Sequence, residues 1–343
     1  MVWGGTRVAE AARQLKEDSA SDALLLAADI GGTYARVGLV RIGDRNAEVS
    51  HFQKYRCAEY PSLSAVFENF LAQAGHGEVR HGAIACAGYA LDDTIINANL
   101  PWPVSQREIR RSLSLDDLLL VNDFTAIAYA TSFVTERDVT PIAAAAEPLE
   151  GPVLVVGPGT GLGAAVRIPG ARSPVILSTE AGQSALAAST DLEVEILRRL
   201  LRDSSHVPME QILSGPGLVN LHAAICALRG VAPAPLTPRE IAEAATGGRN
   251  AVALESLRTF CGWLGSAVGN LVLLYGAQGG VFLAGGILPQ IKDFLLASDF
   301  VPRFRDKGAM RKVLERVPVS LLEHGQLGVL GAARWYVDQR AAG

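Results

Sequence analysis

The sequence predicts an α/β protein of two similar lobes, and two observations lead to that prediction. Apolar, strand-like runs alternate with segments of helical periodicity along most of the 343 residues, a length that suits two domains or one large one. In addition, one order of elements (strand, glycine-rich turn, strand, helix) occurs near residue 30 and again near residue 157. Two copies of one strand-rich unit suggest a ligand-binding cleft between two lobes.

The elements of the first half follow from their patterns. The apolar run 24–29 ends at Gly31 and Gly32, as a buried strand does before a turn. The segment 62–74 has apolar residues at helical spacing. We expect strands at 24–29, 36–41, 49–55, 82–87 and 117–123, and helices at 62–74, 104–112 and 124–133.

The second half repeats the pattern and then adds helices. Pro141 and the small residues up to Pro152 indicate a domain boundary. We expect strands at 151–156, 164–168, 174–179, 280–284 and 317–322, and helices at about 190–203, 209–213, 215–229, 237–246, 250–275, 288–297 and from 328 onward. The expected domains are an N-terminal extension (1–23), a small lobe (24–135) joined by the C-terminal helix (325–343), and a large lobe (136–324).

Composition and charge disfavour several classes of protein. The formal net charge is -4 and no block of like charge occurs, which argues against a nucleic-acid partner. The four cysteines lack CxxC spacing and the histidines form no zinc-like cluster. We expect reduced, buried cysteines and therefore a cytoplasmic location.

The uncharged stretch 259–291 resembles a membrane span in length. Gly265 and Gly269 even form a GxxxG pattern within it. However, Gly276 and two further glycines interrupt the run in its middle. A buried helix to about residue 275, followed by a core strand, fits better, so we expect no membrane partner.

The two glycine-rich turns are candidate phosphate sites. No lysine follows a glycine, which excludes the P-loop GxxxxGK[ST] and leaves Asp29-Ile30-Gly31-Gly32-Thr33-Tyr34-Ala35-Arg36 and Gly157-Pro158-Gly159-Thr160-Gly161-Leu162-Gly163. Glycines let backbone N–H groups approach an anion, and an acid at a strand end can hold a hydrated Mg²⁺. Either turn alone is equally an ordinary hairpin, but two opposed turns can clamp one polyphosphate.

A dinucleotide site is the competing interpretation of the second turn. Gly159, Gly161 and Ala164 approximate the fingerprint G-x-G-x-x-[GA]. That fingerprint needs a helix after the glycines, whereas 164–168 has the pattern of a strand. An NAD-dependent oxidoreductase is therefore a distant alternative.

Carboxylates follow several of the expected strands. Asn122 and Asp123 stand where a strand meets a helix, so Asp123 either caps that helix or serves as a base for a hydroxyl nucleophile, or does both. Glu180 and Glu210 lie in glycine-containing loops and, taken singly, are solvated acids. Together such side chains suit a polyhydroxylated substrate, because each hydroxyl needs a donor and an acceptor.

Several spaced segments resemble, in the right order, the bacterial glucokinase family of the actin/hexokinase type. They are LAADIGGTYARVGL, LVNDFTAIAYA, VVGPGTGLGAA, HVPMEQILSGPGLVNLH, GGVFLAGGILP and FRDKGAMRKVLERVPVSLLEH. The resemblance covers nearly the whole chain from about Leu24. It implies a two-lobed actin-like ATPase (ribonuclease H-like) fold with the active site in the cleft between the lobes.

The resemblance also implies an activity and a set of site residues. The protein would phosphorylate the 6-hydroxyl of D-glucose with ATP and Mg²⁺, usually as a homodimer, with Asp123 as general base. The sugar-binding residues would be Asn99, Asn122, Asp123, Glu180, Gln183 and Glu210. The ATP-binding residues would be Ala28, Asp29, Ile30, Gly31, Gly32, Thr33, Gly159, Thr160, Gly161, Gly285 and Gly286, with Asp29 holding Mg²⁺ through water.

Three positions depart from the family's usual pattern. Gln183 stands where most members have a histidine that touches the sugar, Tyr34 stands where asparagine is frequent, and Ala87-Gly88-Tyr89 replaces a commoner turn that contains proline. Two alternatives therefore stay open. One is a kinase for another hexose or an amino sugar, and the other is a weakly active sugar sensor that acts through a protein partner.

Overall fold

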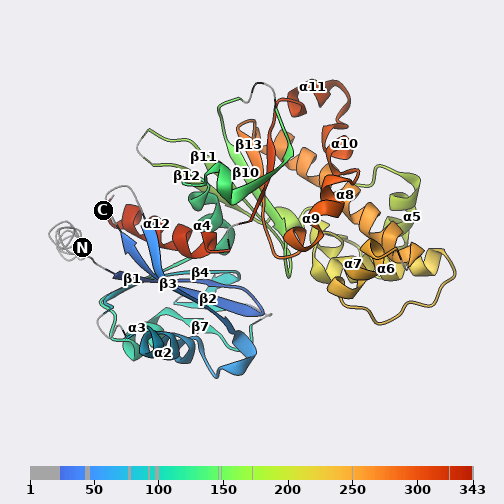
Figure 1. Cartoon of the computed structure of the whole chain (residues 1–343). Helices are drawn as coiled ribbons and strands as arrows, with labels where there is room; N and C mark the ends of the chain where they lie inside the picture. The colour runs from blue at the N-terminus through green and yellow to red at the C-terminus, as the bar shows by residue number, and fades with distance from the viewer. Residues whose placement is uncertain are drawn as a thin grey trace. The chain divides into compact units, whose positions relative to one another are not determined.

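The computed structural model describes residues 24–341, apart from 43–46, 76–78, 92, 97–99, 146, 148, 172, 249 and 324. The extension expected at 1–23 lies outside the described residues. The chain divides into two compact units (Figure 1). Unit 1 contains the described residues up to Phe133 and those after 324, and unit 2 contains Val134–Glu323.

Unit 1 is built on a five-stranded sheet of order β3-β2-β1-β4-β8. Strands β1, β2 and β3 are antiparallel to one another, whereas β1, β4 and β8 run parallel. The strands are β1 (Leu24–Ile30), β2 (Tyr34–Ile42), β3 (Ala47–Arg56), β4 (His81–Cys86) and β8 (Asp117–Val121). All five predicted strands are confirmed, with small differences at their ends.

Helices cover both faces of this sheet because β1 is apolar on both sides. Leu26, Ala28 and Ile30 pack with α2 (Leu63–Ala74) and α3 (Gln106–Ser112). Leu25 and Ala27 point to the other face and pack with α4 (Asp123–Ala130) and α12 (Leu327–Ala341). Figure 1 shows the C-terminal helix α12 beside the N-terminal strands.

The C-terminal helix is fastened to unit 1 by close packing and by charge. A Cβ on Gly331 would lie 2.0 Å from the Ala126 carbonyl oxygen, so only glycine allows α12 to approach α4 this closely. Near the end of α12, two guanidinium nitrogens of Arg340 each lie 2.7 Å from a carboxylate oxygen of Asp117. Tyr336 donates a hydrogen bond to the same carboxylate.

A small three-stranded sheet lies before α3 and is missing from the sequence-based prediction. It consists of β5 (Tyr89–Leu91), β6 (Thr94–Ile96) and β7 (Val104–Ser105). The helix expected at 104–112 starts later than predicted. Ser105 ends β7 and caps α3 by accepting a hydrogen bond from the Glu108 N–H.

Unit 2 repeats the strand plan of unit 1. Its sheet has the order β12-β11-β10-β13-β14-β9, in which β10 is antiparallel to β11 and parallel to β13, as β1 is to β2 and β4. The strands are β9 (Val139–Ala143), β10 (Val153–Pro158), β11 (Leu162–Ile168), β12 (Val175–Thr179), β13 (Gly280–Leu283) and β14 (Val319–Leu322). The predicted duplication of one strand-rich unit is confirmed.

The units do not divide between Pro141 and Pro152, and the observed division lies two residues from the end of the small lobe expected at residue 135. Pro141 belongs to β9, which pairs with β14 at the edge of the unit 2 sheet. Proline is tolerated there because an edge strand does not need every N–H for pairing. The chain leaves unit 1 earlier, after Phe133.

The helices of unit 2 agree with most of the predictions. They are α5 (Asp191–Leu200), α6 (Gly215–Leu228), α7 (Pro238–Thr246), α8 (Ala251–Tyr275), α9 (Lys292–Leu296), α10 (Phe300–Arg305) and α11 (Arg311–Leu314). The helix expected at 209–213 is only a 3₁₀ turn, η5 (Met209–Gln211), and the one expected at 288–297 is the 3₁₀ turn η6 (Leu288–Ile291) followed by α9. Helices α10 and α11 were not predicted.

Helix α8 is the apolar stretch that resembles a membrane span. It is long and apolar enough to cross a membrane, but 72% of its most apolar window is buried within the protein. A Cβ on Gly265 would lie 2.2 Å from the Phe300 carbonyl oxygen, and one on Gly269 would lie 2.6 Å from that of Phe304. The GxxxG pattern therefore packs α8 against α10.

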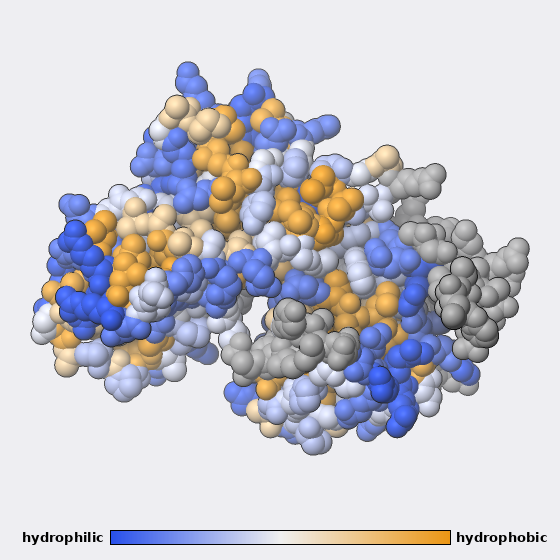
Figure 2. Space-filling model, turned by 180° about the vertical axis from the view of Figure 1, so that it is seen from behind, coloured by the Kyte–Doolittle hydropathy of each residue, from blue (hydrophilic) through white to orange (hydrophobic). Residues whose placement is uncertain are grey.

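On the face of the molecule seen in Figure 2, apolar residues form separate patches among polar ones.

Candidate functional site

The parallel strands of unit 1 end in polar residues at one edge of the sheet. Asp29 stands near the end of β1, Cys86 ends β4, and Asn122 and Asp123 follow β8. Burial raises the pKa of the Cys86 thiol, and the nearby carboxylates of Asp123 and Asp29 raise it further. Both carboxylates therefore lie close enough to this thiol to affect its pKa. Ligands bind at this edge in open α/β sheets.

Asn122, and not Asp123, is the N-cap of α4. The Asn122 Oδ1 accepts a hydrogen bond from the Thr125 N–H at 3.1 Å. Asp123 is the first residue of the helix, and its Oδ1 accepts a hydrogen bond from the Phe124 N–H at 2.9 Å. The capping interpretation of Asp123 is corrected, because Asn122 occupies the N-cap position, while Asp123 accepts from the neighbouring Phe124 N–H within the first turn.

Asp29 is held in place on two sides. Its Oδ2 lies 3.1 Å from Arg36 Nη1, and its side chain is only 16% exposed. A Cβ on Gly328, in the first turn of α12, would lie 2.6 Å from the Asp29 Cγ, so α12 closes over the carboxylate. Burial raises the pKa of Asp29, and the Arg36 charge opposes that rise.

The first glycine turn (31–33) connects β1 to β2. The Gly31 N–H donates to the Tyr34 carbonyl at 3.0 Å, and the Cys57 N–H donates to the Thr33 carbonyl at 3.0 Å. The nearest protein atom to a Cβ on Gly31 would be 3.7 Å away, so neighbouring protein does not require glycine at this position. Open space beside a turn backbone suits an anionic ligand.

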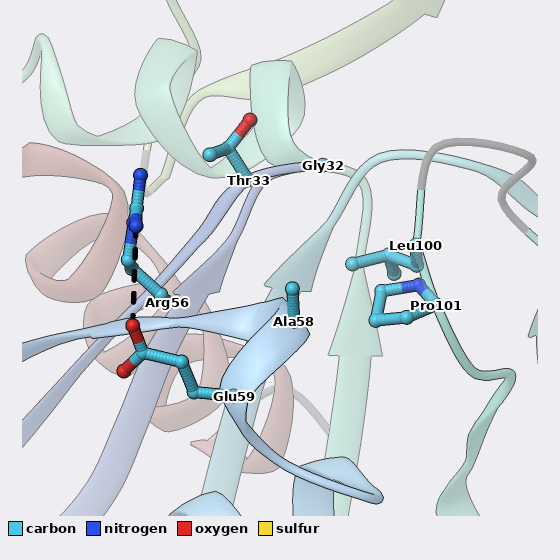
Figure 3. A pocket seen from close by; sticks show the side chains of 7 residues that line it. All are labelled: Gly32, Thr33, Arg56, Ala58, Glu59, Leu100 and Pro101. Carbon is cyan, nitrogen blue, oxygen red and sulfur yellow. Dashed lines mark ion pairs between the residues drawn. The ribbon is translucent and has the colours of Figure 1, made fainter.

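A pocket of about 540 Å³ opens beside this turn (Figure 3). Its walls come from the turn, from the end of β3 with the 3₁₀ turn η2 (Cys57–Glu59), and from the segment before β7. The lining residues are Gly32, Thr33, Arg56, Ala58, Glu59, Leu100 and Pro101. Asn99, a predicted sugar ligand, lies outside the described residues.

The strand ends beside the second glycine turn (159–161), in unit 2, are packed tightly against protein, whereas Gly159 in the turn itself would meet no protein atom within 4 Å of a built Cβ. A Cβ on Gly157 would lie 2.2 Å from the Ala284 carbonyl oxygen, and one on Gly285 would lie 2.3 Å from that of Pro158. Gly285 also has a φ of +92°, which favours glycine. The ends of β10 and β13 are thereby brought together, and Gly286 beside them meets no protein atom within 4 Å of a built Cβ.

Glu210 contacts the second turn directly. Its Oε2 accepts a hydrogen bond from the Leu162 N–H at 3.3 Å and lies 2.7 Å from where a Gly161 Cβ would be. The start of α6 meets the same turn, because the Gly215 N–H donates to the Gly159 carbonyl at 2.8 Å. Glu210 is thus an oriented, partly buried carboxylate, which differs from the solvated acid considered from sequence.

The loop with Glu180 and Gln183 lies beside Leu162 as well. A Cβ on Gly182 would lie 2.3 Å from the Leu162 carbonyl oxygen. Both Glu180 and Gln183 are exposed. The His206 Nε2 lies 2.8 Å from the Gln183 carbonyl oxygen and connects this loop to the segment before Glu210.

The predicted site residues therefore form one group in each unit. Unit 1 groups Asp29, the first glycine turn, Asn122 and Asp123, and unit 2 groups the second glycine turn, Glu180, Gln183, Glu210, Gly285 and Gly286. Ala28 and Ile30 differ from the rest, since their side chains are fully buried in the core of unit 1. Only their peptide groups are available to a ligand.

Sequence reasoning missed Arg36 and Arg56. Arg36 stands opposite Asp29 in the β1–β2 ladder, and Arg56 stands opposite Tyr34 in the β2–β3 ladder. The pairing of Arg36 with Asp29 could have been predicted from the sequence, because it follows from counting residues outward from the glycine turn along both strands. The second requires the β2–β3 register, which contains a bulge between Leu39 and Val40.

Comparisons with known proteins identify the family of this chain. The glucokinase family model matches residues 26–339. A glucokinase of Saccharophagus degradans is 36% identical over 315 residues, covering 92% of this chain and 98% of the relative. A glucokinase-like protein of Xylella fastidiosa is 48% identical over 320 residues, covering 92% and 95%.

A solved structure supports the same relationship. The glucokinase of an Antarctic psychrotroph is similar with a TM-score of 0.79 and 36% identity, covering 91% of this chain and 98% of that one. The predicted two-lobed α/β sugar-kinase fold is therefore confirmed. This chain belongs to the glucokinase family.

Proposed function

We propose that this protein is a glucokinase that transfers the γ-phosphoryl group of ATP to the 6-hydroxyl of D-glucose. The observation that carries the proposal is the position of Asp123. Its carboxylate begins α4 at the carboxyl end of β8, on the sheet edge that also holds Asp29 and the first glycine turn. Family membership over nearly the whole chain supports the same reaction.

In this proposal Asp123 is the general base. The sugar oxygen attacks the γ-phosphorus while its proton passes to the Asp123 carboxylate, an O–P bond forms, and the bond to ADP breaks. A positioned base of this kind contributes about 10²- to 10⁴-fold to the rate. The Phe124 N–H, which donates to Asp123 Oδ1, helps to orient the carboxylate.

Asn99, Asn122, Glu180, Gln183 and Glu210 are the proposed ligands of the other sugar hydroxyls. Charged and amide oxygens accept hydrogen bonds from hydroxyls, and amide N–H groups donate to them. Glu210 is suited to this role because its contact with the Leu162 N–H fixes one oxygen and leaves the other available.

The two glycine turns are the proposed phosphate-binding elements, and Gly285 and Gly286 are proposed to flank the adenosine. Mg²⁺ would neutralise the phosphate charge, and the Asp29 carboxylate is placed to bind this ion through a water molecule. Its carboxylate is already paired with Arg36, so direct coordination would have to break that ion pair. No group of three or more potential metal ligands occurs among the described residues, which suits a cation held mainly by phosphates and water.

The test is ADP release with Mg²⁺-ATP over a panel of hexoses and amino sugars. The proposal expects glucose to be the best substrate by kcat/KM. If only another sugar were phosphorylated, the proposed reaction type would stand and the proposed substrate would change. Folded protein that phosphorylates nothing on the panel would overturn the proposal.

A sugar sensor with little activity is the second candidate, and Gln183 is the observation that favours it. Most of the family is expected to have histidine at this position, and the exposed Gln183 side chain offers an amide instead. Glucose binding by calorimetry, without ADP release in the presence of Mg²⁺-ATP, would support the sensor over the kinase.

We also propose a cytoplasmic homodimer. All four cysteines are free and buried, as suits a reducing compartment. Light scattering coupled to size-exclusion chromatography tests the dimer, and a monomer mass at micromolar concentration would contradict it.

A further inference from the structure

The pocket beside the first glycine turn has a cationic side and an apolar side. Figure 3 shows Arg56 and Glu59 on one side and Leu100 and Pro101 on the opposite side, with Ala58 between them and Thr33 near one end. Arg56 is the one cation among the residues that line the pocket. A volume of about 540 Å³ is in the usual range for small-molecule sites.

The guanidinium of Arg56 is available to a ligand. Its closest acid is Glu59, at 4.0 Å, which is too long for a hydrogen bond. Both side chains are about two-thirds exposed, at 65% and 63%, so this ion pair is weak. A phosphate would offer Arg56 shorter, bidentate hydrogen bonds in its place.

The walls of the pocket are fixed by hydrogen bonds. The Cys57 N–H donates to the Thr33 carbonyl at 3.0 Å, so the backbone next to Arg56 is tied to the glycine turn. On the apolar side, the Trp102 indole N–H donates to the Tyr60 carbonyl at 3.0 Å, which holds the segment after Leu100 against the segment after η2. A pocket that exists before the ligand arrives loses less entropy on binding.

We infer that this pocket binds a hexose 6-phosphate, the product of the proposed reaction, with Arg56 as the ligand of its phosphate group. The inference rests on the proposed function for the identity of the sugar. The Arg56 guanidinium donates to the phosphate together with the Thr33 hydroxyl, which also belongs to the proposed ATP site, and the C–H face of the sugar packs on Ala58, Leu100 and Pro101. Arg56 is thereby a product-binding residue, and accumulated product inhibits the enzyme through it.

Calorimetry of glucose 6-phosphate binding to the full chain, without ATP or Mg²⁺, tests this inference. Arg56→Gln is expected to weaken binding about tenfold, because it removes charge-assisted hydrogen bonds. Glu59→Gln is expected to tighten binding about twofold to threefold, because the competing carboxylate is removed. Effects of opposite sign from neighbouring residues are not expected from general loss of structure.

Arg80→Gln is the matched control. Arg80 also belongs to unit 1, pairs with Asp116 at 3.5 Å, and is 67% exposed, but it does not line the pocket. Its substitution is expected to leave product binding unchanged. Thermal unfolding of all three variants should match the parent protein, because each altered side chain is mainly exposed.

Three outcomes would overturn the inference. The first is that Arg56→Gln binds glucose 6-phosphate as tightly as the parent protein does. The second is that inorganic phosphate binds as tightly as glucose 6-phosphate and depends equally on Arg56. The third is that Arg56→Gln changes the KM for ATP as much as it changes product inhibition. Because calorimetry needs no turnover, it separates the two proposals. Arg56-dependent binding in a protein that phosphorylates no sugar would support this site while refuting the kinase.

Discussion

The two units share one strand plan but differ in the residue at an equivalent strand end and in what faces that residue. Asp29 and Gly157 occupy equivalent positions, next to the last pair of the β1–β2 and β10–β11 ladders. In unit 1 the strand carries the carboxylate, and the helix that faces it has Gly328. In unit 2 the strand itself carries glycine, because the Ala284 backbone occupies the space of a side chain.

The end of β1 in unit 1 therefore carries a charged side chain, whereas the end of β10 in unit 2 is packed against backbone. Unit 1 keeps a carboxylate and its arginine beside an open turn, which suits chemistry. Unit 2 brings two strand ends together and adds Glu210 and the start of α6, which suits a rigid binding surface. The same backbone plan therefore serves two roles through the choice of which residue is small.

The largest expected stability effect concerns the buried ion pair of unit 2. Both Glu193 oxygens accept hydrogen bonds from Arg303 Nη2, at 2.8 and 3.0 Å, and the Glu193 side chain is 2% exposed. Arg303→Met leaves that charge unpaired, so we expect a loss of about 3–5 kcal/mol in the free energy of unfolding. Denaturant titration measures it.

The control is Arg311→Met, which breaks an exposed pair with Glu315. The two side chains are 59% and 44% exposed, so we expect a loss below about 1 kcal/mol. Equal losses in the two variants would contradict the structural role of the buried pair.

Next in size are two glycines at or beside the glycine turns, Gly157 at the end of β10 and Gly31 in the first turn, which test the comparison of the two units directly. Gly157→Ala pushes a Cβ into the Ala284 backbone, and we expect a loss of about 2–3 kcal/mol. Gly31→Ala meets only ordinary contacts, so its stability should stay within about 1 kcal/mol of the parent, while the KM for ATP rises. Denaturant titration and steady-state kinetics check both. A Gly157→Ala protein as stable as Gly31→Ala would refute the packing difference.

A smaller effect depends on pH and on His222 in the core of unit 2. The Ser256 hydroxyl donates to the Val252 carbonyl, so its oxygen accepts from His222 Nδ1–H at 3.0 Å, and Nε2 faces the Cys226 Sγ. Burial lowers the pKa of His222 below its ordinary value of 6.5. Below that pH the unfolded chain binds a proton that the folded protein does not, so stability falls as the pH drops.

The slope from this one group reaches at most about 1.4 kcal/mol per pH unit. Unfolding measured at several pH values below 6.5 should show a shallower slope for His222→Gln than for the parent. If His222→Gln retained the full slope, another group would be responsible.

Local patterns predicted most of the fold because they describe short-range structure. Apolar runs identified the main strands, and helical spacing identified α2 and α8. The strand β9 was missed because its partner β14 lies far away in the sequence, and Pro141 alone indicates a break. The short helices α10 and α11 were missed because tertiary packing, against Gly265 for example, stabilises them more than their own periodicity does.

The candidate site was predictable in its residue types but not in its contacts. Glycines and carboxylates at strand ends are visible in the sequence. That Gly328 closes over Asp29, or that Glu210 meets Leu162, depends on segments brought together only by folding. The sequence-based interpretation considered Asp123 alone as the cap of α4, and the geometry places the cap one residue earlier, at Asn122.

The most direct test of the account is the effect of Asp123→Asn on kcat and on glucose affinity, measured separately. We expect kcat to fall at least about 10²-fold, because the base is lost, while the calorimetric Kd for glucose changes by less than about threefold. Asp116→Asn, at an exposed acid of unit 1, should change neither quantity. Turnover by Asp123→Asn close to that of the parent would contradict the central claim that the carboxylate at the end of β8 takes the proton from the sugar.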